Sequence, residues 1–79
     1  MRNYVIWGRP NCQWCERAKE FLADMNEPYD YVELRPSNLE EFNILTGGAK
    51  TVPQIFYQDE LIGGYEALKF TYPNHTQFY

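Results

Sequence analysis

The sequence predicts a small α/β domain with a four-stranded mixed sheet and three helices, in the order β-α-β-α-β-β-α. The chain has only 79 residues, enough for one domain spanning 1–79. Runs of β-branched and aromatic residues alternate with stretches of helical periodicity, which is typical of α/β proteins. Aromatic residues make up 18% of the chain, and this share supplies large side chains for a small core.

The first half of the chain has the pattern of a strand, a helix and a second strand. Residues 4–7 form a β-branched and aromatic run that stops at a glycine, which indicates a buried strand. Residues 13–25 place their apolar side chains on one helical face, and Asn11 is the expected N-cap, with Cys12 in the first turn. Residues 29–34 form the second strand. Such a unit has a right-handed crossover and parallel strands.

A second helix is predicted shortly after this unit. Residues 37–40 have the Ser-x-x-Glu pattern of a capping box. Leu39, Phe42 and Leu45 form the expected apolar stripe. Two glycines at 47–48 are expected to end the helix.

The remaining elements are a hairpin and a short helix. Residues 54–57 and 61–63 predict antiparallel strands joined by a tight turn near 58–59. A last helix is expected from residue 65 to about 70. Proline has no backbone N–H, so we expect Pro73 to end this helix.

The charge balance and the apolar pattern exclude several classes of partner. Seven Lys and Arg stand against eleven Asp and Glu, and the net charge is −4. The chain therefore has no basic stripe of the kind that a nucleic acid requires. No apolar run approaches the roughly 20 residues of a membrane span, and the N-terminal segment is too short for a signal peptide. We expect a cytoplasmic protein that binds neither nucleic acid nor membrane.

The chemistry is concentrated in two cysteines, Cys12 and Cys15. A small secreted domain normally has four or more cysteines, so one close pair indicates redox chemistry or half of a metal site. A single-chain zinc site needs two further ligands, and the chain has one histidine. A thiolate in the first helical turn faces unpaired N–H groups and the positive end of the helix dipole, and Arg9 adds a nearby cation. Because Cys15 lies one turn deeper, we expect Cys12 to attack and Cys15 to resolve, with a redox-active disulfide between them.

Three motifs, in this order and at this spacing, resemble the glutaredoxins of the thioredoxin-fold superfamily, most closely the small bacterial and bacteriophage members. They are Gly-Arg-Pro-Asn-Cys-Gln-Trp-Cys at 8–15, Thr-Val-Pro-Gln-Ile-Phe at 51–56, and Ile-Gly-Gly-Tyr-Glu at 62–66. The similarity runs from about residue 3 to residue 70. It implies a monomeric, glutathione-dependent oxidoreductase that reduces protein disulfides and glutathione mixed disulfides, without a metal. The compartment would be the cytoplasm, or the host cytoplasm for a viral protein, and ribonucleotide reductase is a candidate substrate.

The resemblance also assigns a glutathione site. In the family the proline of the second motif is cis, so that the preceding backbone can pair with a peptide-like ligand. The third motif lets the start of a helix meet the γ-glutamyl group. Two basic positions pair with the glycine carboxylate, and an aromatic platform lies beside the thiols. The expected glutathione-binding residues are Arg9, Trp14, Lys50, Thr51, Val52, Pro53, Gly64, Tyr65 and Glu66.

The sequence departs from the family pattern at the expected γ-glutamyl site. Many relatives have an aspartate where this chain has Ala67, so Glu66 is the acid available to the γ-glutamyl amine.

Two alternatives to a glutathione-dependent enzyme stay open. One is a redoxin that is reduced directly by thioredoxin reductase; the basic residues Arg9 and Lys50 favour glutathione over this alternative. The other is a non-enzymatic iron–sulfur cluster carrier. The bulky Gln-Trp pair between two retained cysteines is unlike the cluster-binding relatives.

Overall fold

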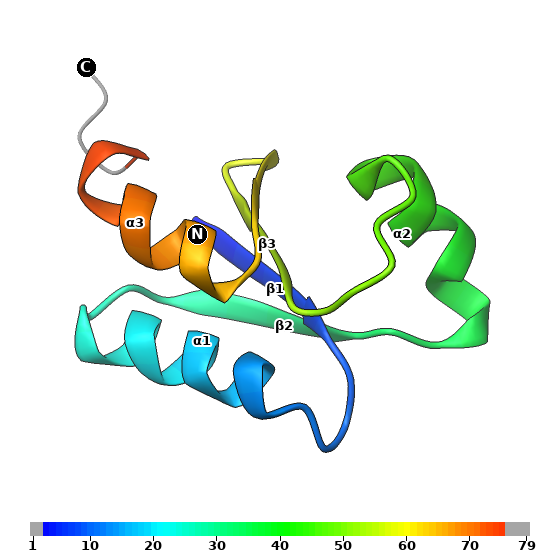
Figure 1. Cartoon of the computed structure of the whole chain (residues 1–79), viewed down its shortest axis with the longest axis horizontal. Helices are drawn as coiled ribbons and strands as arrows, with labels where there is room; N and C mark the ends of the chain where they lie inside the picture. Colours follow the sequence, from blue (N-terminus) through cyan, green and yellow to red (C-terminus); the bar gives the residue numbers. More distant parts are fainter. Residues whose placement is uncertain (1–2, 76–79) are drawn as a thin grey trace.

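The order of elements along the chain confirms the predicted α/β arrangement. A computed structural model describes residues 3–75 (Figure 1). The elements are β1 (Tyr4–Gly8), α1 (Gln13–Asp24), β2 (Tyr29–Glu33), the 3₁₀ turn η1 (Pro36–Asn38), α2 (Leu39–Thr46), β3 (Gln54–Tyr57), β4 (Glu60–Gly63) and α3 (Tyr65–His75). Within this part of the chain, none of the helices has the length and apolar character to cross a bilayer.

The four strands form one mixed sheet in the order β2-β1-β3-β4. β1 runs parallel to β2, with Ile6 opposite Tyr31, as the strand–helix–strand pattern predicts. β1 runs antiparallel to β3, with Ile6 opposite Ile55. β3 and β4 form the predicted hairpin, and both residues of its turn, Gln58 and Asp59, have positive φ (50° and 69°). This is the backbone conformation that a two-residue hairpin turn requires.

Helices cover both faces of the sheet and enclose a separate core on each. Successive strand residues point to opposite faces, so Ile6 and Trp7 belong to different cores. One core lies under α1 and α3 and contains Tyr4, Ile6, Ala18, Leu22, Ile55 and Leu68. The other lies under α2 and contains Trp7, Phe42 and Phe56. Figure 1 shows α2 well apart from α3. The cysteine-bearing end of α1 is thus backed by the larger core.

The N-cap of α1 differs from the prediction. Cys12, and not Asn11, caps the helix, because Cys12 has the extended backbone that a cap needs (φ −109°, ψ 107°). Its sulfur accepts the N–H of Cys15 at 3.2 Å. Asn11 has a left-handed φ of 59° and makes the turn before the helix.

The predicted capping box at residues 37–40 is also wrong. Asn38 is the N-cap of α2, but its side chain does not bond to that helix. Its carbonyl oxygen accepts the Arg35 N–H at 2.8 Å, and its amide nitrogen donates to the Glu33 carbonyl at 3.1 Å. Asn38 therefore holds the turn between β2 and α2, and this use takes its side chain away from the cap.

Two further details differ in α2 and α3. Of the predicted stripe in α2, only Phe42 is buried, while Leu39 and Leu45 are nearly half exposed, because this eight-residue helix meets the sheet through Phe42. α3 continues to His75 instead of ending before Pro73. A proline so near the end of a helix removes a single backbone bond, and its fixed φ is already helical.

Candidate active site

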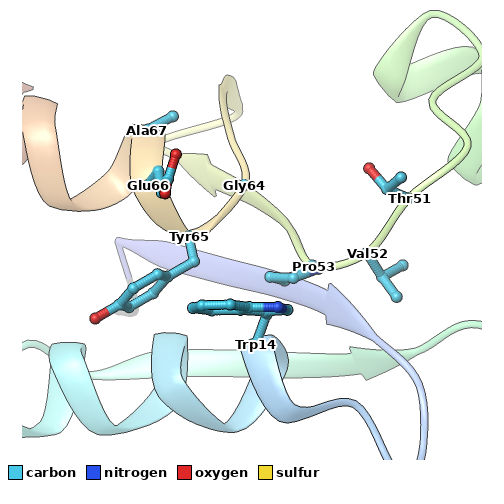
Figure 2. Close-up of a pocket in the computed structure, with 8 residues that line it drawn as sticks. All are labelled: Trp14, Thr51, Val52, Pro53, Gly64, Tyr65, Glu66 and Ala67. Atoms are coloured by element: carbon cyan, nitrogen blue, oxygen red, sulfur yellow. The ribbon is translucent and has the colours of Figure 1, made fainter.

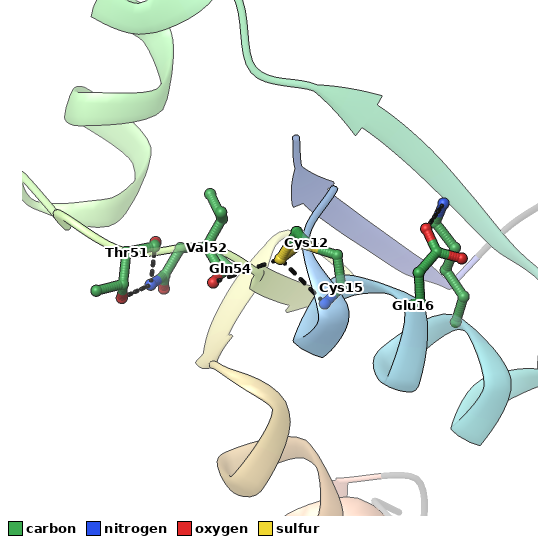
Figure 3. Close-up of a disulfide and its surroundings, with 7 residues drawn as sticks. Cys12, Cys15, Glu16, Thr51, Val52 and Gln54 are labelled. Atoms are coloured by element: carbon green, nitrogen blue, oxygen red, sulfur yellow. Dashed lines mark hydrogen bonds and ion pairs between the residues drawn. A yellow bond between two sulfur atoms is a disulfide. The ribbon is translucent and has the colours of Figure 1, made fainter. Parts of the chain in front are cut away.

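The two cysteines lie where β1 passes into α1, and a disulfide joins them in this structure (Figure 3). Their Cα atoms are 5.2 Å apart. Cys12 is partly exposed, whereas Cys15 has no exposed surface. An external thiol or disulfide can therefore reach Cys12 and not Cys15. Among residues 3–75, no group of three or more Cys, His, Asp and Glu side chains is arranged to hold a metal ion.

The sulfur of Cys12 lies at the amino end of α1. This sulfur accepts the Cys15 N–H. The backbone carbonyl of Cys12 accepts the Glu16 N–H at 3.1 Å and so begins the first turn of the helix. The N–H donor and the helix dipole stabilise negative charge on this sulfur once the disulfide opens. The Glu16 carboxylate would oppose this effect, but it pairs with Lys19 at 3.0 Å.

The loop before β3 lies against the cysteine pair. Its Val52–Pro53 peptide bond is cis, as the resemblance implies. The Val52 carbonyl oxygen is 3.9 Å from the sulfur of Cys12. Gln54 braces the loop from within: its side chain is buried, and its amide donates to the Thr51 carbonyl at 2.9 Å (Figure 3). The backbone of this loop is thus held beside the sulfur that external groups can reach.

A groove of about 310 Å³ runs between this loop and the start of α3 (Figure 2). Its lining residues are Trp14, Thr51, Val52, Pro53, Gly64, Tyr65, Glu66 and Ala67. Trp14 is 48% exposed, and its ring centroid lies 5.6 Å from that of Tyr65. In Figure 2 the Trp14 ring lies directly below Pro53. The three segments that carry the sequence motifs therefore meet at one surface.

Seven of the nine residues expected to bind glutathione line this groove, and two do not. Arg9 and Lys50 are exposed, lie outside the lining, and make no ion pair with any residue in the described range. Sequence reasoning missed Arg17, whose guanidinium carbon is 5.0 Å from the Trp14 ring centroid. The signal was present, because residues three apart on a helix are neighbours. Gln54 was missed because its bonds could not be read from the sequence.

Known proteins are similar to this chain in sequence and in fold. The Glutaredoxin family model matches residues 4–62. Glutaredoxin 1 of Rickettsia conorii is 34% identical over 71 residues, which cover 86% of this chain and 70% of that protein. Glutaredoxin 1 from Francisella tularensis, solved as a complex with cacodylate, has a TM-score of 0.78 at 28% identity, covering 95% and 96% of the two chains. A buckwheat glutaredoxin–glutathione complex has a TM-score of 0.77 at 20% identity, covering 92% and 70%, and so shows the same fold.

Proposed function

Because the chain belongs to the glutaredoxin family and carries the Cys12-x-x-Cys15 pair, it is a thiol–disulfide oxidoreductase, and we propose that glutathione is its electron donor. Its substrates are protein disulfides and glutathione mixed disulfides, and it works as a cytoplasmic monomer. One observation carries the proposal: the groove that adjoins the Cys12 sulfur is walled by the backbone of Val52 and the start of α3. Its volume suits a small peptide-like ligand.

The two cysteines have different tasks in this proposal. The Cys12 thiolate attacks a substrate disulfide, forms a mixed disulfide, and releases one substrate thiolate. Cys15 then loses its proton and attacks the Cys12 sulfur, which restores the Cys12–Cys15 disulfide and releases the second substrate thiolate. With a glutathione mixed disulfide, a second glutathione can complete the reaction without Cys15. The difference in exposure between the two sulfurs supports this division.

The start of α3 suits the γ-glutamyl end of glutathione. The first backbone bond of this helix runs from the Leu68 N–H to the Gly64 carbonyl at 3.0 Å. The N–H groups of Tyr65, Glu66 and Ala67 therefore have no acceptor within the helix and can receive a carboxylate. With Ala67 in place of an acid, the exposed Glu66 carboxylate is the group proposed to meet the amine.

The Val52 backbone pairs with the middle of the tripeptide in this proposal, and Trp14 covers one side of it. Arg9 and Lys50 meet the glycine carboxylate, since both cations are exposed and without partners among residues 3–75. A fold relative from buckwheat was solved with glutathione, which supports the ligand class. The proposed binding residues are those expected from the sequence.

The electron donor is tested by measuring turnover of a small glutathione mixed disulfide with glutathione, glutathione reductase and NADPH. We expect turnover that depends on glutathione. A parallel reaction replaces glutathione and its reductase with thioredoxin reductase. Turnover in the parallel reaction alone would contradict the proposal and favour a redoxin reduced directly by that flavoprotein.

The roles of the thiols are tested in the same assay with two variants. Cys12→Ser should abolish activity on every substrate. Cys15→Ser should keep much of the activity on a small glutathione mixed disulfide and lose most of it on protein disulfides. Equal loss in both variants on the small substrate would show that the proposed division is wrong.

A further inference from the structure

A phenol lies beside the inner sulfur, and no step described so far uses it. A methyl group placed on Gly8 would lie 2.8 Å from the sulfur of Cys15 and 3.0 Å from the hydroxyl oxygen of Tyr31. Because Gly8 has no side chain, the Cys15 sulfur and the Tyr31 hydroxyl both border the small space next to its Cα. Tyr31 pairs with Ile6 across β1 and β2, so it faces the same core that α1 covers. Cys15 has no exposed surface, and Tyr31 is partly buried against the core beside it.

The hydroxyl of Tyr31 is a hydrogen-bond donor, and no residue within 3–75 accepts its proton in the disulfide state. Burial raises the pKa of Tyr31, with Lys19 lowering it and Glu33 and Glu16 raising it further, so the phenol keeps its proton at neutral pH. Lys19 holds the ring from the side of α1: its Nζ is 3.9 Å from the ring centroid and 3.0 Å from the Glu16 carboxylate.

We propose that the Tyr31 hydroxyl donates a hydrogen bond to the Cys15 sulfur when the disulfide opens, and that this bond stabilises Cys15 as a thiolate. A disulfide sulfur is a weak acceptor, whereas a thiolate is charged and accepts strongly, so the bond forms on reduction. An unpaired thiolate in a fully buried position would otherwise be strongly disfavoured. The phenol keeps its proton throughout and acts by hydrogen bonding alone.

This bond acts in both directions of the reaction, and it rests on the division of tasks proposed above. In reduction of the enzyme, a glutathione thiolate attacks the Cys12 sulfur, the S–S bond breaks, and its electron pair leaves on Cys15. Tyr31 stabilises that charge until Cys15 takes a proton. In ring closure, Cys15 gives up its proton, its electron pair forms the bond to Cys12, and the substrate thiolate leaves. Tyr31 then increases the fraction of Cys15 present as thiolate.

The size of the effect follows from general values. A hydrogen bond to a charged group shifts the balance between thiol and thiolate by about ten- to a hundredfold. A thiolate of lower pKa is also a weaker nucleophile, so that about half of this shift, on a logarithmic scale, remains in the rate. Removing the hydroxyl of Tyr31 should therefore slow ring closure about three- to tenfold.

The test is Tyr31→Phe, which removes one oxygen and keeps the ring against the core. The Cys12–glutathione mixed disulfide is formed, and its closure to the Cys12–Cys15 disulfide is followed by rapid acid quenching and mass spectrometry. Closure should be about three- to tenfold slower than in the wild type. In a Cys15→Ser background, Tyr31→Phe should leave the attack of Cys12 on a small mixed disulfide unchanged.

Tyr29→Phe is the matched control, because Tyr29 lies on the same strand and face but pairs with Tyr4, away from Gly8. This control should close at the wild-type rate. Wild-type closure in Tyr31→Phe overturns the inference alone, and so does equal slowing of the Cys12 attack in the Cys15→Ser background. If Cys15→Ser itself reduces protein disulfides normally, the division of tasks fails, and the inference fails with it.

Thermal melting of Tyr31→Phe shows whether the variant folds. If it does not fold, 3-fluorotyrosine introduced at position 31 keeps the hydroxyl and makes it a stronger donor. The fluorinated protein should then close its disulfide faster than the wild type. An unchanged rate would overturn the inference.

Discussion

Gly8→Ala tests how tightly the space beneath the cysteine pair is filled. The added methyl would lie 2.8 Å from the sulfur of Cys15 and 3.0 Å from the ring and hydroxyl of Tyr31. Neither neighbour can move easily. The sulfur of Cys15 is fixed by the helix and by the disulfide, and Lys19 holds the Tyr31 ring from the other side. The substitution should therefore overpack this site in the oxidised protein.

The expected cost follows from comparison with a second glycine. Overpacking of a filled core costs about 1–3 kcal/mol, while any Gly→Ala change returns about 0.4–1 kcal/mol by restricting the unfolded chain. Gly64→Ala carries the same gain, but its methyl would meet only the Pro53 carbonyl, at an ordinary 3.6 Å. The two variants should differ by about 1–3 kcal/mol in free energy of unfolding. In a domain of this size that is about 4–8 °C in Tm for each kcal/mol.

Urea unfolding of the oxidised proteins, followed by far-ultraviolet circular dichroism, measures both variants. Gly8→Ala should unfold at lower urea than wild type, and Gly64→Ala should match or exceed wild type. The slopes of the transitions should agree, since the surface exposed on unfolding is the same. If the two variants lie within about 0.5 kcal/mol of each other, Tyr31 and Cys15 can yield at low cost, and the packing argument is wrong.

Three further outcomes can be checked. Lys50→Ala and Glu66→Gln should each raise the Michaelis constant for a glutathionylated substrate up to about fivefold, and this increase should become smaller as the salt concentration rises. Unchanged Michaelis constants at low salt would mean that glutathione is held by backbone groups alone. Phe42→Ala should destabilise the fold by about 3–5 kcal/mol in urea unfolding, whereas the half-exposed Leu45→Ala should cost under about 1 kcal/mol. Burial raises the pKa of Tyr4, so the stability it contributes is complete below the unfolded value of about 10 and falls as pH rises above it. Urea midpoints that stay constant from pH 9 to about pH 11 would contradict this.

The order of elements was predictable because its signals are local. Strand runs, helical periodicity and the glycines that end α2 all lie within short stretches of sequence, and the structure confirms each. Caps depend on single backbone conformations. Asn11 is a favourable N-cap by residue type, but it has a left-handed φ, and Cys12 is the N-cap instead. Burial in α2 depends on how the helix meets the sheet, which the apolar spacing of Leu39 and Phe42 does not determine.

The cysteine pair of the site could be predicted from the sequence pattern, but the groove and the surroundings of Gly8 could not. Placing Cys12 and Cys15 at a helix start required only spacing and periodicity. The groove between Val52 and α3 came from family resemblance, because segments so far apart in sequence meet only through the sheet. The placement of Tyr31 and Cys15 around Gly8 depends on the register of β1 and β2 and on a glycine at the end of β1. No sequence pattern indicates such an arrangement.

The bond from the Cys15 N–H to the sulfur of Cys12 also offers a spectroscopic reporter. The proton chemical shift of an amide responds to the charge of the atom that accepts it. The acceptor here is the sulfur that passes through disulfide, thiolate and mixed-disulfide forms. In a ¹⁵N-labelled sample, one cross-peak therefore distinguishes the three forms during turnover, without a dye or a modified substrate.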